Sequence, residues 1–274
     1  MSKRSLTYAE GIRLTAVLDT GNLVTVGGAA LEVYDRGSGP AIVLLHGAGG
    51  LRHEAPYLAA LSAQARVIAP SHPGFGRSPL PEWIASIDDL AYLYLDLLDQ
   101  YDLHDVTLVG MSMGGWTAAE IAIKCSHRLA RLVLVDPVGI KPSGREVRDI
   151  PDIWALDDAT LAKLTLHDPT SAPDYGAMSD GELEIVARNR EAAALYLWEP
   201  YMHNPQLLRR LHRVGIPTLL VRGASDGLVS EAYLRSYSAA IAGSRIVTIE
   251  RAGHAPAMER PDAFVQTVLG FMGE

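Results

Sequence analysis

Residues 105–115 read DVTLVGMSMGG, and this stretch carries the strongest structural signal in the chain. An apolar run ends at Gly110, Ser112 stands between two methionines, and a second run resumes after a pair of glycines. Short apolar runs that end at glycine are typical of strands buried on both faces, whereas the run from Met113 onward has helical spacing. The stretch therefore predicts a strand, a sharp turn that exposes Ser112, and a helix.

The same alternation runs along most of the chain. Seven more β-rich runs, most of them short and apolar, lie at residues 22–27, 30–37, 41–47, 65–70, 129–136, 216–223 and 244–250. Stretches with helical spacing lie at residues 55–63, 84–101, 113–125, 231–242 and 261–272. Strands that alternate with helices indicate parallel pairing with helices on both faces. The sequence therefore predicts an α/β fold built on a mostly parallel eight-stranded sheet.

The alternation is interrupted between residues 137 and 215. This connection is far longer than the few residues that usually join a strand to a helix, and it contains a capping-box pattern that begins at Ser179. We expect a helical cap at residues 141–205. It would be inserted into one core domain formed by residues 1–140 and 206–274.

Large aromatic side chains are frequent in the predicted cap. Trp154, Tyr196, Trp198 and Tyr201 are the expected substrate-pocket residues, because ligand pockets are usually lined by apolar and aromatic groups. Packing of the cap onto the core is an equally good explanation for any one of them. If they do line a pocket, the cap sets the choice of substrate.

The turn at Ser112 matches the G-x-S-x-G nucleophile elbow, since Gly110 precedes the serine by two residues and Gly114 follows it by two. In such a turn the serine adopts a strained backbone conformation that exposes its hydroxyl, and the glycines avoid collisions. The backbone N–H of Met113, at the start of the following helix, is then a candidate oxyanion donor. The alternative is a chance match around a buried serine.

A serine hydroxyl needs a base, and the base needs an orienting carboxylate. Of the nine histidines, His254 is the best candidate because it follows the last predicted strand and precedes the last helix. Asp226 follows the preceding strand, so both reach the same sheet edge as Ser112, in the chain order typical of such a triad. Asp226 could instead simply form an Asp-Gly turn. Asp136, at another strand end, is the rival acid.

A second oxyanion donor is expected in the turn after residues 41–47, where the sequence continues as Ala48 followed by two glycines. Small residues let the backbone approach a ligand closely, so we expect the Ala48 amide to fill this role. The stretch matches neither a P-loop nor a complete dinucleotide-binding fingerprint. Nucleotide binding is therefore disfavoured.

The composition indicates an ordinary globular protein, with 48% hydrophobic and 20% charged residues and a net charge of −8. Dispersed negative charge argues against nucleic-acid and anionic-membrane partners, so the expected partner is a small-molecule substrate, and a homo-oligomer is compatible with the sequence. The single cysteine, Cys125, and the absence of an apolar leader or membrane-length run predict a cytoplasmic protein. We expect no metal or organic cofactor.

Five segments, taken in order, resemble the α/β-hydrolase superfamily over almost the whole chain. They are HGAGG, APSHPGFGRS, GMSMGG, RGASDGLV and AGHAPAMERPDAF. The resemblance implies that Ser112 is the nucleophile, His254 the general base and then acid, and Asp226 the orienting acid. It also implies that the Ala48 and Met113 amides form the oxyanion hole. Serine at the elbow argues against the haloalkane dehalogenase and epoxide hydrolase branches, because a chain that resembled either branch would have aspartate at this position.

The substrate class depends on smaller signals. The branch that hydrolyses carbon–carbon bonds in ring-cleavage products tends to show HG-x-G-P-G and a tryptophan after the catalytic histidine. Here His46 is followed by GAGG, and His254 is followed by Ala255. The sequence therefore favours hydrolysis of a small to medium carboxylic ester, lactone or thioester through an acyl-enzyme on Ser112. The alternatives are a carbon–carbon bond hydrolase and a non-catalytic ligand-binding protein.

Overall fold

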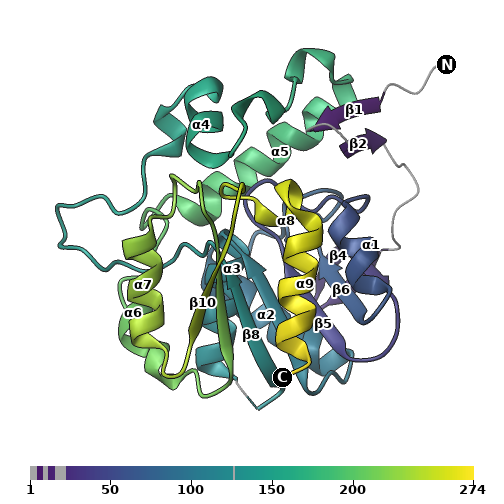
Figure 1. Cartoon of the computed structure of the whole chain (residues 1–274). Coiled ribbons are helices and arrows are strands. Elements are labelled where there is room, and N and C mark those ends of the chain that lie inside the picture. The colour runs from purple at the N-terminus through teal and green to yellow at the C-terminus, as the bar shows by residue number, and fades with distance from the viewer. Residues whose placement is uncertain (1–4, 9–11, 16–22, 126) are drawn as a thin grey trace.

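The computed structural model describes residues 5–8, 12–15, 23–125 and 127–274, and its centre is an eight-stranded sheet (Figure 1). In chain order its strands are β3 (Leu23–Val26), β4 (Ala29–Arg36), β5 (Ala41–Leu45), β6 (Arg66–Pro70), β7 (Val106–Met111), β8 (Leu129–Val135), β9 (Thr218–Gly223) and β10 (Arg245–Ile249). Their spatial order is β10-β9-β8-β7-β5-β6-β4-β3. Pairing is parallel from β10 to β6, whereas β4 is antiparallel to both β6 and β3. The predicted mostly parallel eight-stranded sheet is confirmed.

Helices cover both faces of the sheet because its central strands are apolar on both sides. Ile42 and Leu44 of β5 pack with α1 and α9, whereas Val43 and Leu45 pack with α2, α3 and α7. The bounds of these helices are α1 (Pro56–Ser62), α2 (Ile87–Gln100), α3 (Met113–Lys124), α7 (Glu231–Ala240) and α9 (Pro261–Met272). Side chains alternate along a strand, so a continuous apolar run produces two cores.

The second helix begins later than its apolar spacing suggests. The predicted start is residue 84, but α2 begins at Ile87. Ser86 is the N-cap: its hydroxyl accepts the Asp89 N–H at 3.1 Å, and the Asp89 carboxylate accepts the Ser86 N–H at 2.9 Å. This reciprocal pair satisfies two N–H groups that the first helical turn leaves free, and so fixes the start of the helix.

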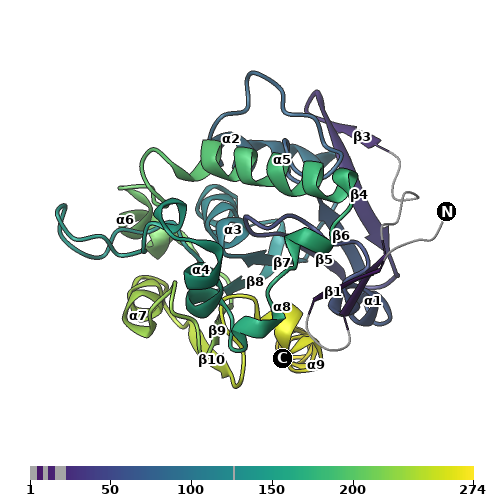
Figure 2. The same cartoon turned by 90° about the horizontal axis from the view of Figure 1, so that it is seen from above.

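Much of the segment between β8 and β9 lies over the carboxyl ends of the central strands, at the top of Figure 1. Its longer helices are α4 (Asp158–Thr165) and α5 (Asp180–Leu197), with short 3₁₀ turns at Ile153–Ala155, Pro169–Ser171 and Tyr175–Ala177. Seen from above, α4 and α5 lie nearer the viewer than the strands of the sheet (Figure 2). The chain returns to β9 through α6 (Leu207–Arg210) and a 3₁₀ turn at Leu211–Arg213. We refer to the part of this segment from the first 3₁₀ turn to the end of α5, residues 153–197, as the cap.

A two-stranded antiparallel sheet, β1 (Ser5–Tyr8) and β2 (Ile12–Thr15), precedes the main sheet and is not part of it. The pattern of apolar residues does not predict these strands. Short strands of four residues give too brief an alternation to stand out from the surrounding polar residues.

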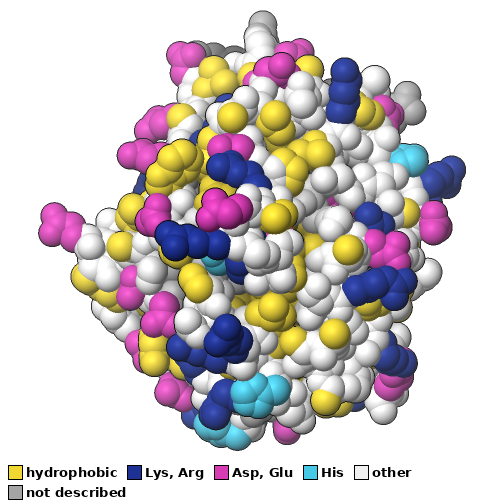
Figure 3. Space-filling view, turned by 90° about the vertical axis from the view of Figure 1, so that its left-hand side faces the viewer, with side chains coloured by type: hydrophobic (Ala, Val, Ile, Leu, Met, Phe, Trp, Pro, Cys, Tyr) yellow, Lys and Arg dark blue, Asp and Glu magenta, His cyan; other side chains and the backbone are white. Residues whose placement is uncertain are grey.

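The surface carries charges of both signs. On the side shown in Figure 3, acidic and basic side chains are interspersed, and no large area is of one sign. Within the described ranges, no helix combines the length and apolarity that crossing a membrane requires.

Candidate active site

Ser112 lies at the turn between β7 and α3, with backbone angles φ 51° and ψ −112°. The turn is tight: a Cβ on Gly110 would lie 2.3 Å from the carbonyl oxygen of Gly114. A Cβ on Gly114 would lie 2.2 Å from the carbonyl oxygen of Leu45. Only glycine fits either position, which is the physical reason for the spacing of the motif. The strained serine is held at the carboxyl edge of the sheet.

Three of the predicted side chains meet at this edge. His254 Nε2 lies 2.8 Å from Ser112 Oγ, and His254 Nδ1 lies 2.8 Å from Asp226 Oδ2. An ionised carboxylate only accepts hydrogen bonds, so the imidazole proton is on Nδ1 and Nε2 is left to accept the serine proton. The arrangement can therefore generate a serine nucleophile.

Asp226 is held as an anion facing the imidazole. Its Oδ1 accepts the backbone N–H groups of Leu228 at 2.7 Å and Val229 at 3.0 Å, while Oδ2 accepts from His254. Burial alone would raise the pKa of this carboxyl, but the charge and hydrogen bond of His254, with the Val229 N–H, outweigh burial and lower the pKa. The carboxylate is thus ionised at neutral pH and fixed in orientation.

The rival acid, Asp136, lies directly after β8 and is fully buried. Its Oδ2 accepts the Gly223 N–H at 3.0 Å. The hydrogen bond from His254 goes to Asp226. Among the described residues, Asp136, Asp226 and His254 form one group close enough to ligate a metal ion, but both nitrogens of His254 are already engaged within the triad.

The two predicted oxyanion amides belong to the two segments that meet at Ser112. Met113 is the first residue of α3, and its N–H belongs to the first helical turn, whose amides have no acceptor inside the helix. Ala48 lies in the turn after β5, and a Cβ on the adjacent Gly47 would lie 3.2 Å from the Ser112 Cβ. The turn therefore lies close to Ser112, and the convergence of the Ala48 and Met113 amides on one oxyanion stays a prediction.

A buried histidine pair holds this turn in place. The His72 N–H donates to His46 Nε2 at 2.9 Å, so His46 must carry its proton on Nδ1, which donates to the Gly47 carbonyl at 2.7 Å. That carbonyl belongs to the same peptide unit as the Ala48 N–H. The hydrogen bond therefore fixes the plane of the predicted oxyanion donor.

The second histidine completes the arrangement. His72 Nε2 donates to the His46 carbonyl at 2.9 Å, and its Nδ1 accepts from the Tyr94 hydroxyl. Burial lowers the pKa of His72 to about 4, and burial followed by the charge of His72 lowers that of His46. Both imidazoles are neutral in the folded protein. The sequence alone gives no signal that His46 and His72 pair.

The neutral histidines predict acid lability. Unfolded, His72 binds a proton below pH 6.5, whereas folded it binds one only near pH 4, so the free energy of unfolding should fall as the pH drops between these values. The loss from His72 alone is about 3 kcal/mol. Denaturant unfolding from pH 7 to pH 4 measures it, with His72→Gln as a non-titrating control. Equal pH slopes for the two proteins would contradict the assignment.

The C-terminal end of α4 contacts both loops that carry the acid and the base. The His254 N–H donates to the Thr165 carbonyl at 2.7 Å, and the Gly227 N–H donates to the Leu164 carbonyl at 2.9 Å. These are two of the carbonyls that the end of a helix leaves without partners. The cap therefore helps to position the triad.

Two polar side chains form hydrogen bonds that connect the cap to the rest of the protein. The Glu259 carboxylate accepts the N–H of Gly253 at 2.7 Å and that of His167, in the cap, at 2.8 Å. Asn189 of α5 accepts the Gly76 N–H at 3.0 Å and donates to the Gly49 carbonyl at 3.2 Å. Sequence reasoning missed both, because each contact joins segments far apart in the chain.

The four aromatic residues predicted for a pocket have different environments. The Tyr196 side chain is buried, and its hydroxyl donates to the Pro73 carbonyl at 3.0 Å. Tyr201 donates to the Pro151 carbonyl at 2.6 Å, Trp154 is half-buried, and Trp198 is 57% exposed at the end of α5. The two tyrosine hydroxyls are thus engaged with backbone groups.

Comparison with known proteins identifies a family and several relatives of this chain. The model of the "Alpha/beta hydrolase family" matches residues 42–267. The chain is 26% identical to a 2-hydroxy-6-oxo-2,4-heptadienoate hydrolase of Pseudomonas putida, over 93% of this chain and 96% of that protein. It is 28% identical to a pimeloyl-[acyl-carrier protein] methyl ester esterase of Aeromonas hydrophila, over 89% of this chain and 100% of the esterase.

The fold has solved counterparts as well. A meta-cleavage product hydrolase of Pseudomonas fluorescens superimposes with a TM-score of 0.74 at 23% identity, covering 94% of this chain and 99% of that one. At that identity the likeness shows the fold alone. The family model, in contrast, spans most of the chain and includes Ser112, Asp226 and His254. The chain therefore belongs to the alpha/beta hydrolase family.

Proposed function

We propose that this protein hydrolyses a carbon–carbon bond next to a ketone in a 2-hydroxy-6-oxo-dienoate. The observation that carries the proposal is the relationship to the Pseudomonas putida hydrolase along almost the full length of both proteins. The triad of Ser112, His254 and Asp226 supplies the nucleophile and proton carrier that such a reaction needs. This reverses the preference for esters that the sequence motifs alone suggest.

The first half of the proposed reaction acylates the serine. His254 Nε2 takes the Ser112 proton as Oγ attacks the ketone carbon C6, and the carbonyl oxygen becomes an oxyanion facing the Ala48 and Met113 amides. The C5–C6 bond then breaks. Its electron pair enters the conjugated system that ends in the 2-keto acid, which makes a carbon leaving group feasible.

Three proton transfers and one water complete the reaction cycle. The dienol form must first move its 2-hydroxyl proton to C5, because the keto form accepts the electron pair of the breaking bond. His254 returns the serine proton to the departing enolate, and water activated by the same imidazole then hydrolyses the acyl–Ser112 ester. The net reaction consumes one water and releases a carboxylic acid and a hydroxydienoate.

Ester hydrolysis is the second candidate function, favoured by a specific observation. Ala255 follows His254 and Gly50 stands where the carbon–carbon branch tends to have proline, and the esterase of Aeromonas hydrophila is similar over 89% of this chain. The same triad and amides would serve this reaction. Only the leaving group differs.

A matched pair of substrates separates the two candidates. 2-Hydroxy-6-oxo-2,4-heptadienoate and p-nitrophenyl acetate both place an acetyl group on Ser112, so deacylation is common and kcat/KM compares acylation alone. We expect kcat/KM for the dienoate to exceed that for the ester by at least about 100-fold, because remote parts of a true substrate contribute transition-state binding. Each assay follows its own chromophore.

The outcomes are distinct. Turnover of the nitrophenyl ester without any turnover of the dienoate would overturn the proposal in favour of ester hydrolysis. Turnover of neither, with no burst of nitrophenol, would indicate a ligand-binding protein. The Ser112→Ala variant is the control for spontaneous decay of both compounds.

A further inference from the structure

Asp136 is a buried acid that the triad does not use directly. It follows β8, the residue is 0% exposed, and its backbone has φ 41°, a region that residues other than glycine adopt uncommonly. Its Oδ2 accepts the Gly223 N–H at 3.0 Å. Its Oδ1 is buried with no hydrogen-bond partner among the described residues. Buried polar atoms are almost always paired, so this oxygen requires an explanation.

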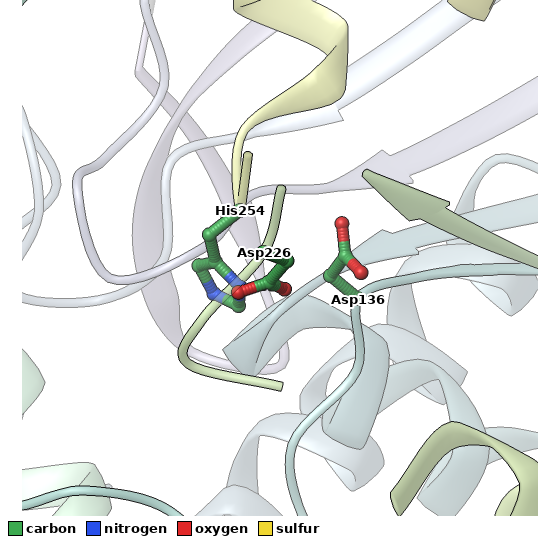
Figure 4. Close-up of side chains that lie close together, drawn as sticks. All are labelled: Asp136, Asp226 and His254. Carbon is green, nitrogen blue, oxygen red and sulfur yellow. The ribbon is translucent and has the colours of Figure 1, made fainter. Parts of the chain in front are cut away.

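The nearest acid is a member of the triad. Figure 4 shows the Asp226 carboxylate between the His254 ring and Asp136, and ligand atoms of the three residues all lie within 4.8 Å of one another. Asp226 already uses Oδ1 for the N–H groups of Leu228 and Val229 and Oδ2 for His254. Each oxygen of a carboxylate has two lone pairs, so Asp226 can still accept another donor.

Two buried negative charges this close repel each other strongly. The charged and titratable groups facing Asp136 are Asp226, His254 and Arg222. The Arg222 guanidinium donates to the backbone carbonyls of Ala224 and Asp226, each at 3.0 Å. Its two terminal nitrogens are therefore directed to backbone oxygens, and its Nε has no hydrogen-bond partner among the described residues. Since no hydrogen bond joins Arg222 to Asp136, a second carboxylate charge would be poorly compensated.

We propose that Asp136 is a protonated carboxylic acid at neutral pH and donates its Oδ1–H to the Asp226 carboxylate. The pair then carries one negative charge, located on the residue that faces His254. The donated hydrogen bond fixes the orientation of Asp226 and satisfies the otherwise unpaired Oδ1. Asp136 is a positioning residue, because it acts on the imidazole only through Asp226.

The electrostatics of the pair agree with this assignment. Burial, followed by the negative charge of Asp226, raises the pKa of Asp136 well above its usual range. The pKa of Asp226 moves the opposite way, downward. When the surroundings raise the pKa of one carboxyl group and lower that of its neighbour, the first group stays neutral and can donate a hydrogen bond. The second stays charged and accepts it.

An isosteric variant provides the kinetic test. In Asp136→Asn the amide oxygen can accept the Gly223 N–H and the amide nitrogen can donate to Asp226, so kcat/KM should stay within about 3-fold of wild type. Asp136→Ala lacks the donor and should lose roughly 10- to 100-fold. A loss of 100-fold or more in Asp136→Asn, with the fold intact, would show that Asp136 acts as an anion and would overturn the proposal.

A spectroscopic measurement tests the protonation state without substrate. The infrared difference spectrum between wild type and Asp136→Asn at pH 7 should contain the carbonyl stretch of a protonated carboxylic acid, shifted by exchange into D₂O. Glu259→Gln is the matched control, since Glu259 accepts two N–H groups and should show only carboxylate bands. A carboxylate band for Asp136 would refute the proposal. Because no substrate is used, this result is independent of the proposed function.

Discussion

Replacing Ser112 with alanine is expected to lower kcat by about 10⁶-fold, the size of loss seen when other serine triads lose their nucleophile. The Ser112 hydroxyl is the atom that His254 can deprotonate, at 2.8 Å. Without it no acyl-enzyme can form. Single-turnover assays with the dienoate and with p-nitrophenyl acetate measure the effect.

The fold should tolerate this substitution. Alanine removes one oxygen from a half-buried side chain, and the backbone hydrogen bonds of Ser112 to Val135 and Trp116 remain. Thermal unfolding of the variant should match that of wild type. A well-folded, pure variant that kept more than a few per cent of the activity would rule out Ser112 as the nucleophile.

Asp226→Asn is expected to cost about 10⁴ in kcat, as loss of the orienting carboxylate does in other triads. The Leu228 and Val229 N–H groups already point at Oδ1, so the amide oxygen must stay there and the NH₂ group must face His254. That donor forces the imidazole proton from Nδ1 to Nε2. Nε2 can then no longer accept the serine proton.

The matched control is Asp136→Asn, measured under the same conditions. The hydrogen bond from His254 goes to Asp226, so asparagine at position 136 should have little effect. If the two variants gave the reverse order of activities, Asp136 would be the triad acid and the geometry of the resting protein would not represent the working one.

The sequence alone predicts the sheet and the group formed by Ser112, Asp226 and His254. The prediction is possible because parallel strands end at one edge, so a residue just after a strand is placed by topology rather than by details of packing. The glycines around Ser112 add a local steric requirement that is visible in the sequence.

Contacts between distant segments could not be predicted in this way. The bond from His46 to the Gly47 carbonyl depends on His72, which is brought alongside by the turn after β6. The environments of Tyr196 and Trp198 depend on the rotation of α5 about its axis, which buries one and exposes the other. Aromatic composition alone does not determine which rings face a substrate.

The preference between substrate classes is the least predictable feature. Residues such as Ala255 are single positions, and the triad geometry is shared by ester and carbon–carbon bond hydrolysis. Motif departures favour esters, whereas similarity to the Pseudomonas putida protein over 93% of this chain favours a dienoate. We expect the choice of substrate to depend on groups outside the triad that stabilise the leaving group.

Labelling with a fluorophosphonate, followed by peptide mapping by mass spectrometry, tests the central claim most directly. The reagent reacts with a serine only where a base activates it and an oxyanion site receives the developing charge. One stoichiometric adduct on Ser112 is predicted, with labelling strongly slowed in Asp226→Asn. An unlabelled Ser112, or an adduct on a different residue, would contradict the proposed triad.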